Sequence, residues 1–363
     1  MKSLGKIAIL LIMTGNVVFI ILLLLSAYSP YMNPAKVPLL GCMGLIFPIF
    51  LIVNVCFLVF WLPIRYKLAL VPLVALLLCF PQIRAYIPVN IRTKNIPENS
   101  IKLLTYNVMN FNTMEKVDGK SPILAYIKNS GADIICLQEF VPASNRKYLT
   151  QENINDVLKE YPYRRIHKLG KLKNNGIACY SKYPILSDRV LSYESDSNGS
   201  VVYEIKIGND TITLINNHLE SNKLTTEDRK LYENLIESPE SAKVKRGARY
   251  LLGKLKEAVA IRGKQGKVIR EEVKNAPHKS VIVCGDFNDS PLSYPHHLLT
   301  KELNDAFSQS GSGLGISFNR NKFYFRIDHI LMSKNLKAYN CTVDRSIKDS
   351  DHYPMWCYIS KRK

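Results

Sequence analysis

Charged residues are almost absent from the amino-terminal part of this chain. None occurs in residues 7–27, 37–64 or 68–83. The first two stretches are long enough to cross a bilayer as helices, at about 1.5 Å of rise per residue, and the third is marginal. The acidic or polar faces that a buried core helix of a soluble domain would present are missing, which excludes that explanation.

We therefore expect a transmembrane region over residues 1–88, with helices near 7–27, 38–62 and 68–87. A secretory signal peptide is the alternative for the first helix. Its apolar stretch is too long for the hydrophobic part of such a peptide, and another apolar stretch follows at once. The sequence thus favours an integral membrane protein whose helices contact the lipid bilayer.

Lysines and arginines in the short loops predict the orientation of these helices. Lys2 and Lys6 place the amino end in the cytoplasm, Arg65 and Lys67 place the second loop there too, and the first loop carries only Lys36. Three helices put the rest of the chain outside the cytoplasm, whereas two would leave it inside. We expect three, and hence an extracytoplasmic domain.

Cysteine motifs are missing as well. The part of the chain after residue 100 has five cysteines and no CxxC spacing, so neither a zinc motif nor a full disulfide framework is indicated. The first three lie in apolar runs, where a thiol behaves as a small hydrophobic group. The odd number mildly opposes an oxidising compartment, in conflict with the predicted orientation. The five are Cys136, Cys179, Cys284, Cys341 and Cys357.

Acidic residues are too few to balance the basic ones. The chain has 49 Lys and Arg against 30 Asp and Glu, a net charge of +19. Such an excess favours an anionic partner, which includes nucleic acid, phospholipid headgroups and phosphorylated small molecules. Solubility together with attraction to the neighbouring membrane explains the excess equally well, and nothing indicates a protein partner.

Strand-like and helix-like segments alternate after a short polar linker at residues 89–100. Short β-branched runs bounded by turn residues are typical of buried strands. The long charged stretch 224–276 favours two helices, the second of which covers a face of a sheet. Basic residues at 164–173 are typical of a phosphate-binding rim or of a solvated loop. The pattern predicts one α/β domain over residues 101–363, with strands at 101–106, 133–137, 176–181, 201–207, 211–216, 279–284, 326–332 and 355–359 and helices at 122–129 and 153–160.

Polar motifs follow or interrupt these apolar runs. A polar residue at the end of each strand is delivered to one rim of a sheet, which is how a strand-built active site is assembled. The motifs are Thr105-Tyr106-Asn107-Val108, Leu137-Gln138-Glu139, Asn217-His218-Leu219, Gly285-Asp286-Phe287-Asn288, Arg326-Ile327-Asp328-His329 and Ser350-Asp351-His352-Tyr353-Pro354.

Four of the motif residues are carboxylates: Glu139, Asp286, Asp328 and Asp351. Brought together, they repel one another and raise one another's pKa unless a cation or histidines compensate. Oxygen ligands of this kind suit Mg²⁺ or Mn²⁺, which share their remaining positions with water and substrate phosphate. The set therefore predicts a divalent-metal site.

The remaining motif side chains suit chemistry on a phosphoester. His218 and His352 can donate to phosphate oxygens or act as acid and base near neutral pH. Asn107 and Asn288 orient a carboxylate, a water or the phosphate. Together with a cation, this inventory predicts metal-assisted hydrolysis of a phosphoester bond. The other histidines outside the motifs, among them His296 and His297, receive no role.

Six motifs in this order resemble the endonuclease/exonuclease/phosphatase superfamily, over about residues 101–360. The resemblance implies a DNase I-like four-layer α/β/β/α sandwich with its site between the edges of two sheets. It also implies that Glu139 is the principal Mg²⁺ ligand, supported by Asn107, with Asp351 as a possible further ligand. Asp286 would orient or deprotonate the attacking water, and Asn288 would position that water with the phosphate.

The same resemblance gives roles to the two histidines. His352 would contact the scissile phosphate, held in the right tautomer by Asp328, and His218 would donate to the phosphate or leaving group. Abasic-site endonucleases of this superfamily have an Asp where this chain has Met109 and a Tyr where it has His218. These differences favour the branch of DNase I, sphingomyelinases and phosphatases.

The sequence as a whole predicts a membrane-anchored, Mg²⁺-dependent phosphoesterase. Its substrate is a phosphodiester or phosphomonoester, such as nucleic acid, a lipid headgroup or a sugar phosphate. The alternative is a membrane protein of the same fold that binds anionic partners without turnover. A lost catalytic group would favour that alternative, and none is lost beyond the Asp that Met109 replaces.

Overall fold

A computed structural model gives the fold of this chain. It describes residues 2–112, 121–145, 148–171, 173–193, 195–223, 225, 227–228, 231, 242–320 and 323–362. Among these residues, two helices are long and apolar enough to cross a membrane, Gly5–Tyr31 and Met43–Leu78. Short helical segments flank them. The amino-terminal elements are α1 (Lys2–Tyr28), η1 (Ser29–Tyr31), α2 (Pro38–Gly41), α3 (Met43–Leu78) and α4 (Phe80–Tyr86).

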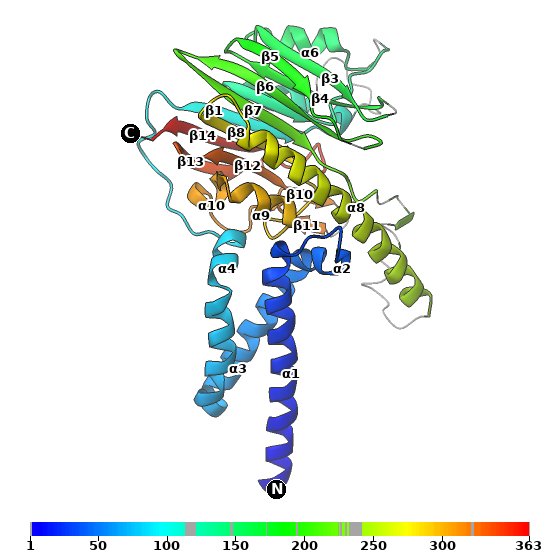
Figure 1. Cartoon of the computed structure of the whole chain (residues 1–363), viewed down its shortest axis with the longest axis vertical. Helices are drawn as coiled ribbons and strands as arrows, with labels where there is room; N and C mark the ends of the chain where they lie inside the picture. The colour runs from blue at the N-terminus through cyan, green and yellow to red at the C-terminus, as the bar shows by residue number, and fades with distance from the viewer. Residues whose placement is uncertain are drawn as a thin grey trace.

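Helix α3 is interrupted at Arg65, where the backbone has φ −153° and ψ 82°. Pro63 precedes the break, and proline cannot donate the hydrogen bond that a helix interior requires. The two halves of α3 run back beside each other, and they lie with α1 below the domain that carries the sheets (Figure 1). Asn54 joins α3 to α1, because its Nδ2 donates to the carbonyl of Phe19 at 3.0 Å.

The described strands after residue 100 form two six-stranded mixed sheets and a small hairpin. The first sheet has the order β13 (Leu336–Val343), β14 (Met355–Lys361), β1 (Ile101–Asn107), β2 (Ile134–Gln138), β4 (Asn175–Ser181), β3 (Tyr163–Leu169). The second has the order β5 (Ile185–Val190), β6 (Gly199–Ile207), β7 (Asp210–His218), β8 (Ser280–Asp286), β12 (Asp328–Ser333), β9 (Leu303–Asp305). The hairpin pairs β10 (Phe318–Arg320) with β11 (Phe323–Phe325).

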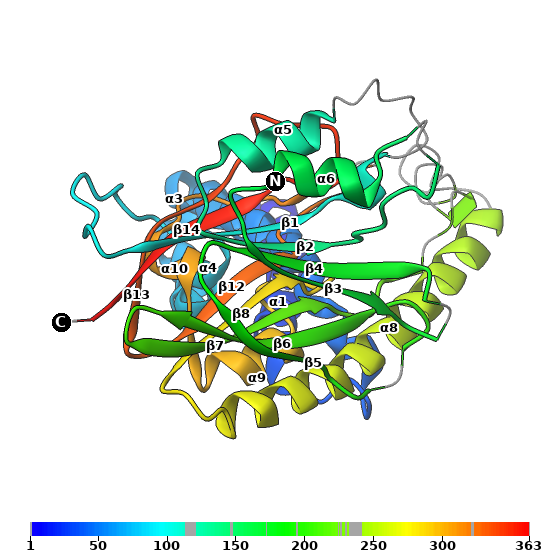
Figure 2. The ribbon, with the colours of Figure 1, turned by 90° about the horizontal axis from the view of Figure 1, so that it is seen from above.

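Helices cover the outer faces of both sheets. Helices α5 (Pro122–Asn129) and α6 (Gln151–Val157) lie on the first sheet, and α8 (Ala242–Lys274) and α9 (Tyr294–Thr300) lie on the second (Figure 2). The short elements η2 (Met109–Asn112) and α10 (Ala306–Ser310) follow β1 and β9. This arrangement confirms the predicted four-layer α/β/β/α sandwich.

Apolar side chains of both sheets form the core between them. Leu103 and Cys136 of the first sheet share this cluster with Tyr203, Cys284 and Met332 of the second. All eight cysteines are free, and the five after residue 100 are buried. The thiols therefore pack as small hydrophobic groups, as the sequence predicts.

Several elements differ from the sequence-based expectations. The basic stretch 164–173, interpreted as a phosphate-binding rim or a solvated loop, contains most of strand β3, whose Arg165 pairs with Asp188 at 2.7 Å. The helix expected at 153–160 begins two residues earlier, since Thr150 caps its amino end. Helix α8 is the second helix expected within 224–276; most of the first lies outside the described residues.

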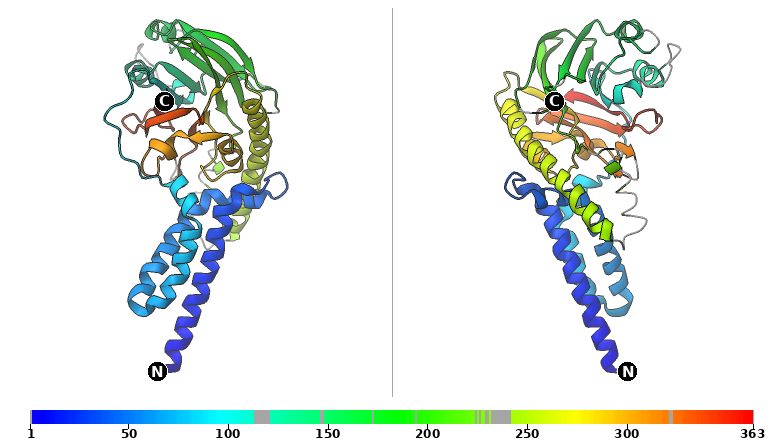
Figure 3. Two further views of the ribbon diagram at one scale, coloured as in Figure 1. Left: turned by 60° about the vertical axis from the view of Figure 1, so that its left-hand side comes forward. Right: turned by 90° about the vertical axis from the view of Figure 1, so that its right-hand side faces the viewer.

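The amino-terminal helices pack directly against the sandwich (Figure 3). A side chain at Gly44 of α3 would clash with the carbonyl oxygen of Leu292. The rings of Tyr31 and His297 lie 4.3 Å apart. In the expected linker, Asn90 donates to the carbonyl of Gly311 at 2.7 Å. Residues 89–100 are therefore attached to the domain at defined points.

Candidate active site

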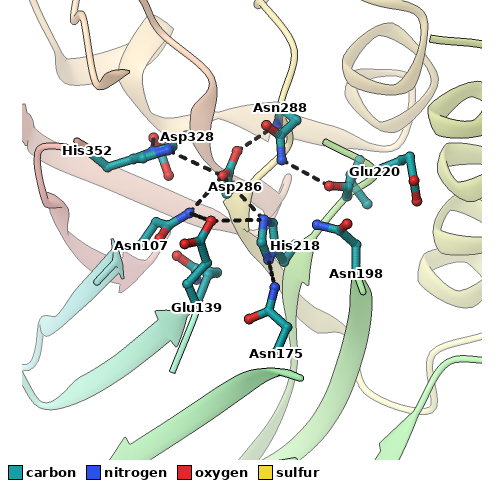
Figure 4. Close-up of polar contacts among 12 residues, drawn as sticks. Asn107, Glu139, Asn175, Asn198, His218, Glu220, Asp286, Asn288, Asp328 and His352 are labelled. Atoms are coloured by element: carbon teal, nitrogen blue, oxygen red, sulfur yellow. Dashed lines mark hydrogen bonds and ion pairs between the residues drawn. The ribbon is translucent and has the colours of Figure 1, made fainter. Parts of the chain in front are cut away.

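The strand topology brings the predicted site residues to one edge of the sandwich. Strands β1 and β2 are parallel, as are β7 and β8, so the carboxyl ends of all four lie at that edge. Strand β12 is antiparallel to β8 and begins there, with Asp328 opposite Asp286. In Figure 4, side chains from these strand ends point toward a common centre.

Unusual backbone conformations aim these side chains. Glu139 and Asn288, each just past the end of a strand, have φ of 50° and 52° in the left-handed region. Gly285 has φ 122°, and a Cβ there would clash with the carbonyl oxygen of Asn217 on the neighbouring strand. Only glycine fits this position. Backbone strain of this kind clusters at functional sites.

Asn107 connects the two halves of the site. Its Nδ2 donates to Glu139 Oε1 at 3.1 Å and to Asp286 Oδ2 at 3.1 Å. Its Oδ1 accepts from the backbone N–H of Met109 at 3.1 Å, which fixes the orientation of the amide. One neutral side chain therefore holds a carboxylate from each sheet in place (Figure 4).

His352 and Asp328 form a buried pair at the centre of the site. Asp328 Oδ2 lies 2.8 Å from His352 Nδ1, and Asp286 Oδ2 lies 3.6 Å from His352 Nε2. Burial disfavours the imidazolium, but the two carboxylates outweigh it and raise the pKa of His352 to about 10. His352 is therefore a cation at neutral pH.

Asp286 lies at the meeting point of these contacts. Burial raises its pKa to about 6, against the opposing effect of His352. Its Oδ1 accepts from the backbone N–H of Asn288 at 2.7 Å, and the Asn288 Nδ2 donates to the carbonyl of Leu219 at 3.0 Å. Asp286 is thus mostly ionised at neutral pH and remains able to accept a proton.

The contacts of His218 determine which ring nitrogen carries its proton. The backbone N–H of Gly176 donates to Asn175 Oδ1 at 2.7 Å, so the Asn175 Nδ2 faces His218 Nδ1, at 3.3 Å. Because Nδ2 is only a donor, Nδ1 accepts and Nε2 carries the hydrogen. That Nε2 lies 3.8 Å from Glu139 Oε1 and 3.7 Å from Asp286 Oδ2. Burial lowers the pKa of His218, which keeps the ring neutral.

The site residues fit a divalent cation. Asp286 and Asp328 flank one fixed cation, His352, and Asn107 holds a third carboxylate, Glu139, beside Asp286. Asp328 Oδ1 is buried and has no hydrogen-bond partner among the described residues. The Glu139 side chain is 31% exposed, so it is open to solvent on one side. Oxygen donors with surplus negative charge and access to water are what Mg²⁺ requires. In contrast, the carboxylate of Asp351 points to Arg320, whose Nη1 lies 3.3 Å away.

Sequence reasoning missed two residues that support the site, Asn175 and Ser350, and a buried carboxylate, Glu220, that follows Leu219 in the chain. Asn175 fixes the ring of His218, and Ser350 Oγ donates to the carbonyl of Asn107 at 2.8 Å while accepting from the backbone N–H of His352. Buried Glu220 accepts from Ser195 at 2.6 Å and is drawn beside Asn198 in Figure 4. Ser350 begins one of the six sequence motifs, so it could have been found there. Asn175 could not, because only the fold brings it to His218.

Fold and site together define a class, the DNase I-like phosphoester hydrolases. A model of the endonuclease/exonuclease/phosphatase family matches residues 104–352, and this chain belongs to that family. A second model, a domain of unknown function (DUF8431), matches residues 8–86. No curated relative matches the sequence. The family supports an enzyme that hydrolyses phosphoester bonds, and its members generally use divalent metals.

Solved structures share the fold at low sequence identity. Humanized TDP2 of D. rerio is 14% identical with a TM-score of 0.51, covering 73% of this chain and all of that one. D. rerio TDP2 complexed with single strand DNA product is 16% identical, also at 0.51, over 72% of this chain and 99% of that one. The human Nocturnin catalytic domain with bound sulfate anion is 16% identical with a TM-score of 0.50, covering 76% of this chain and 97% of that one.

Proposed function

We propose that this protein is a membrane-anchored, Mg²⁺-dependent phosphoesterase. The observation that carries the proposal is the meeting of Asp286 with Asn107, His218 and His352 at one strand-end centre, with each contact within 3.8 Å. A protein that only binds anions has no use for a buried carboxylate there, because that charge repels phosphate. The arrangement instead suits the activation of water beside a phosphorus atom.

Glu139, supported by the amide of Asn107, would hold the cation, Mg²⁺ or its substitute Mn²⁺. The family resemblance implies Asp351 as a further ligand, but its carboxylate is paired with Arg320 at 3.3 Å, so Glu139 carries the assignment. When bound, the cation neutralises the charge that develops on the phosphate oxygens. Asn107 contributes by keeping Glu139 and Asp286 at a fixed separation, since it donates to both.

Asp286 and Asn288 would act on the attacking water. Asp286 is largely ionised at pH 7, because its pKa is about 6, and it accepts a proton from the water. The backbone N–H of Asn288 holds one carboxylate oxygen, which leaves the other, Oδ2, facing the centre of the site. The Asn288 side chain positions the water relative to the phosphate.

The two histidines would act on the phosphate itself. His352 is protonated at neutral pH and donates from Nε2 to a phosphate oxygen, while Asp328 holds Nδ1. Neutral His218 offers its Nε2–H to the phosphate or to the leaving oxygen. The pentacovalent transition state is thereby stabilised by donors from both sheets while water attacks in line.

The helices at the amino end would anchor the enzyme through three crossings. Helix α1 begins, and α3 turns, at the end of the helical bundle farthest from the sandwich (Figures 1 and 3). Lys6 and the pair Arg65 and Lys67 belong to those two segments. The positive-inside rule places that end in the cytoplasm and the catalytic domain outside it.

This orientation is tested with single introduced cysteines, Lys168→Cys on β3 and Lys6→Cys on α1. Both positions are exposed, and the five native cysteines of the sandwich are buried. A membrane-impermeant maleimide applied to intact cells should label Lys168→Cys and leave Lys6→Cys unlabelled until the membrane is broken. Labelling in the opposite order would overturn the orientation.

Nucleic acid and lipid headgroups are the two substrate classes that the observations favour. The basic charge of the chain and the D. rerio TDP2 structure with single strand DNA product support the first. The membrane anchor supports the second. The full-length protein in detergent should be tested on plasmid DNA, an aryl phosphodiester, sugar phosphates and phospholipid vesicles, each with Mg²⁺ or EDTA.

The variants His352→Ala and Asp286→Ala provide the controls. A nuclease should slow steeply as salt rises, because phosphate contacts release counterions. A headgroup enzyme should respond to how the lipid is presented. Loss of metal-dependent turnover in both variants would support the assigned site. Binding of these substrates with no turnover by the native protein would instead establish the non-catalytic alternative.

A further inference from the structure

A second buried cluster of metal-ligating side chains lies away from the candidate active site. His296 belongs to α9, Asp305 ends β9, and His329 belongs to β12. All three are buried, with 4%, 7% and 0% of their surface exposed. Helices α9 and α10 lie between the second sheet and the amino-terminal helices (Figure 1), so the cluster is on the side of the sandwich that contacts the anchor.

The contacts of His329 leave one ring nitrogen unsatisfied. Its Nε2 lies 3.0 Å from the carbonyl oxygen of Asp289, so this nitrogen carries the hydrogen and donates it. The other nitrogen, Nδ1, therefore has a free lone pair. It is fully buried and has no hydrogen-bond partner among the described residues. Leaving such an acceptor unpaired costs about 1–3 kcal/mol.

His296 and Asp305 complete the group. His296 Nε2 lies 3.1 Å from Asp305 Oδ2, and one ligand atom from each of the three residues lies within 4.8 Å of the others. The rings of His296 and His329 are 4.7 Å apart. A ligating histidine in metalloproteins typically donates its second N–H to a carbonyl or carboxylate, which is the contact that His329 makes with Asp289.

We infer that His296, Asp305 and His329 bind one transition metal ion, with Zn²⁺ as the cation that best suits two imidazoles and one carboxylate. The unpaired Nδ1 of His329 is satisfied by this ion. This site has no residue in common with the candidate catalytic centre.

A cavity gives the ion a path to the cluster. It has a volume of about 500 Å³ and lies between the amino-terminal helices and the sandwich. His296 and Asp305 line it, together with Pro30 and Arg84 from the anchor side. Water from this cavity would supply the remaining ligand. The ion would fasten α9, β9 and β12 to one another beneath the surface on which the anchor helices rest.

Cobalt binding to the full-length, chelator-stripped protein in detergent tests this site. Co²⁺ bound by imidazole nitrogen in tetrahedral geometry absorbs strongly in the visible range, whereas an octahedral oxygen site does not. The titration uses the Glu139→Gln background, which removes the expected ligand of the catalytic site. We expect one tightly bound equivalent per chain with this absorption, displaced by Zn²⁺.

Three variants in the same background identify the ligands. His296→Asn and Asp305→Asn should each lose the bound equivalent and its absorption. Asp305 also caps α10, since its Oδ1 accepts from the backbone N–H of Phe307 at 2.7 Å, and the amide oxygen of Asp305→Asn can still make this cap. His297→Asn is the matched control, because His297 is adjacent on α9 and outside the cluster; it should bind like the parent. Absence of the tetrahedral absorption in the parent, or equal binding by His296→Asn and His297→Asn, would overturn the inference.

Discussion

Replacing Asp328 by Asn tests the pair that Asp328 forms with His352 without changing the shape of the site. Asp328 is 1% exposed and bonds His352 Nδ1 at 2.8 Å. The amide keeps the volume and an acceptor oxygen but removes the negative charge. The pKa of His352, about 10 in the native protein, should then fall toward its ordinary value. The pKa of His352 should stay partly raised, because the carboxylate of Asp286 still lies 3.6 Å from Nε2.

The size of the effect follows from the kind of hydrogen bond that is lost. A bond to a charged partner contributes about 1.5–3 kcal/mol. At about 1.4 kcal/mol per pKa unit, this corresponds to about 1 to 2 units for His352. If the imidazolium donates to the phosphate in the transition state, the same energy predicts a loss of about 10- to 150-fold in kcat/KM for Asp328→Asn.

The assay is the pH dependence of kcat/KM. Activity that needs protonated His352 is present below its pKa and is lost as pH rises through that value. The alkaline limb of the Asp328→Asn profile should therefore move down by about 1 to 2 pH units. Asp188→Asn, at the far edge strand β5, is the control and should match the native profile. An unshifted limb with undiminished kcat/KM would refute the assigned pair.

Three further predictions concern the metal, the support of the site and its backbone. Glu139→Gln should raise the Mg²⁺ concentration needed for half-maximal rate by at least about tenfold, and an unchanged Mg²⁺ titration would exclude Glu139 as a ligand. Arg262→Met leaves the Asp289 carboxylate buried and unpaired, so denaturant unfolding should show a loss of about 3–5 kcal/mol, partly restored by adding Asp289→Asn. Gly285→Ala forces a clash with Asn217 and should cost about 1–3 kcal/mol together with most of the activity; native stability in this variant would contradict the backbone argument.

The central strands could be predicted from the sequence because their apolar runs are buried on both faces. Strand β1 and strand β8 lie at the centre of their sheets, and each was bounded by turn residues. Edge strands carry a weaker signal. Residues 163–169 of β3 are mostly exposed and rich in basic side chains, because β3 lies at the edge of its sheet, so the sequence favoured a phosphate-binding rim or a solvated loop there.

In the candidate site too, some residues could be predicted from the sequence and others could not. Asn107, His218 and Asp286 stand at the ends of predictable strands, and the sequence indicated that they meet. The tautomer of His218 depends on Asn175, which begins β4 in the other sheet and whose approach to His218 is set only by folding. The cluster around His329 depends on elements that approach only after folding, so no spacing along the chain could reveal it.

The measurement that tests the central claim most directly is the turnover of the preferred phosphoester by the full-length protein, with the native chain compared with His352→Gln. We predict that Mg²⁺ supports hydrolysis, that EDTA abolishes it and added Mg²⁺ restores it, and that His352→Gln loses at least about a hundredfold in kcat/KM. Hydrolysis that persists in EDTA, or that proceeds equally in His352→Gln, would contradict the account.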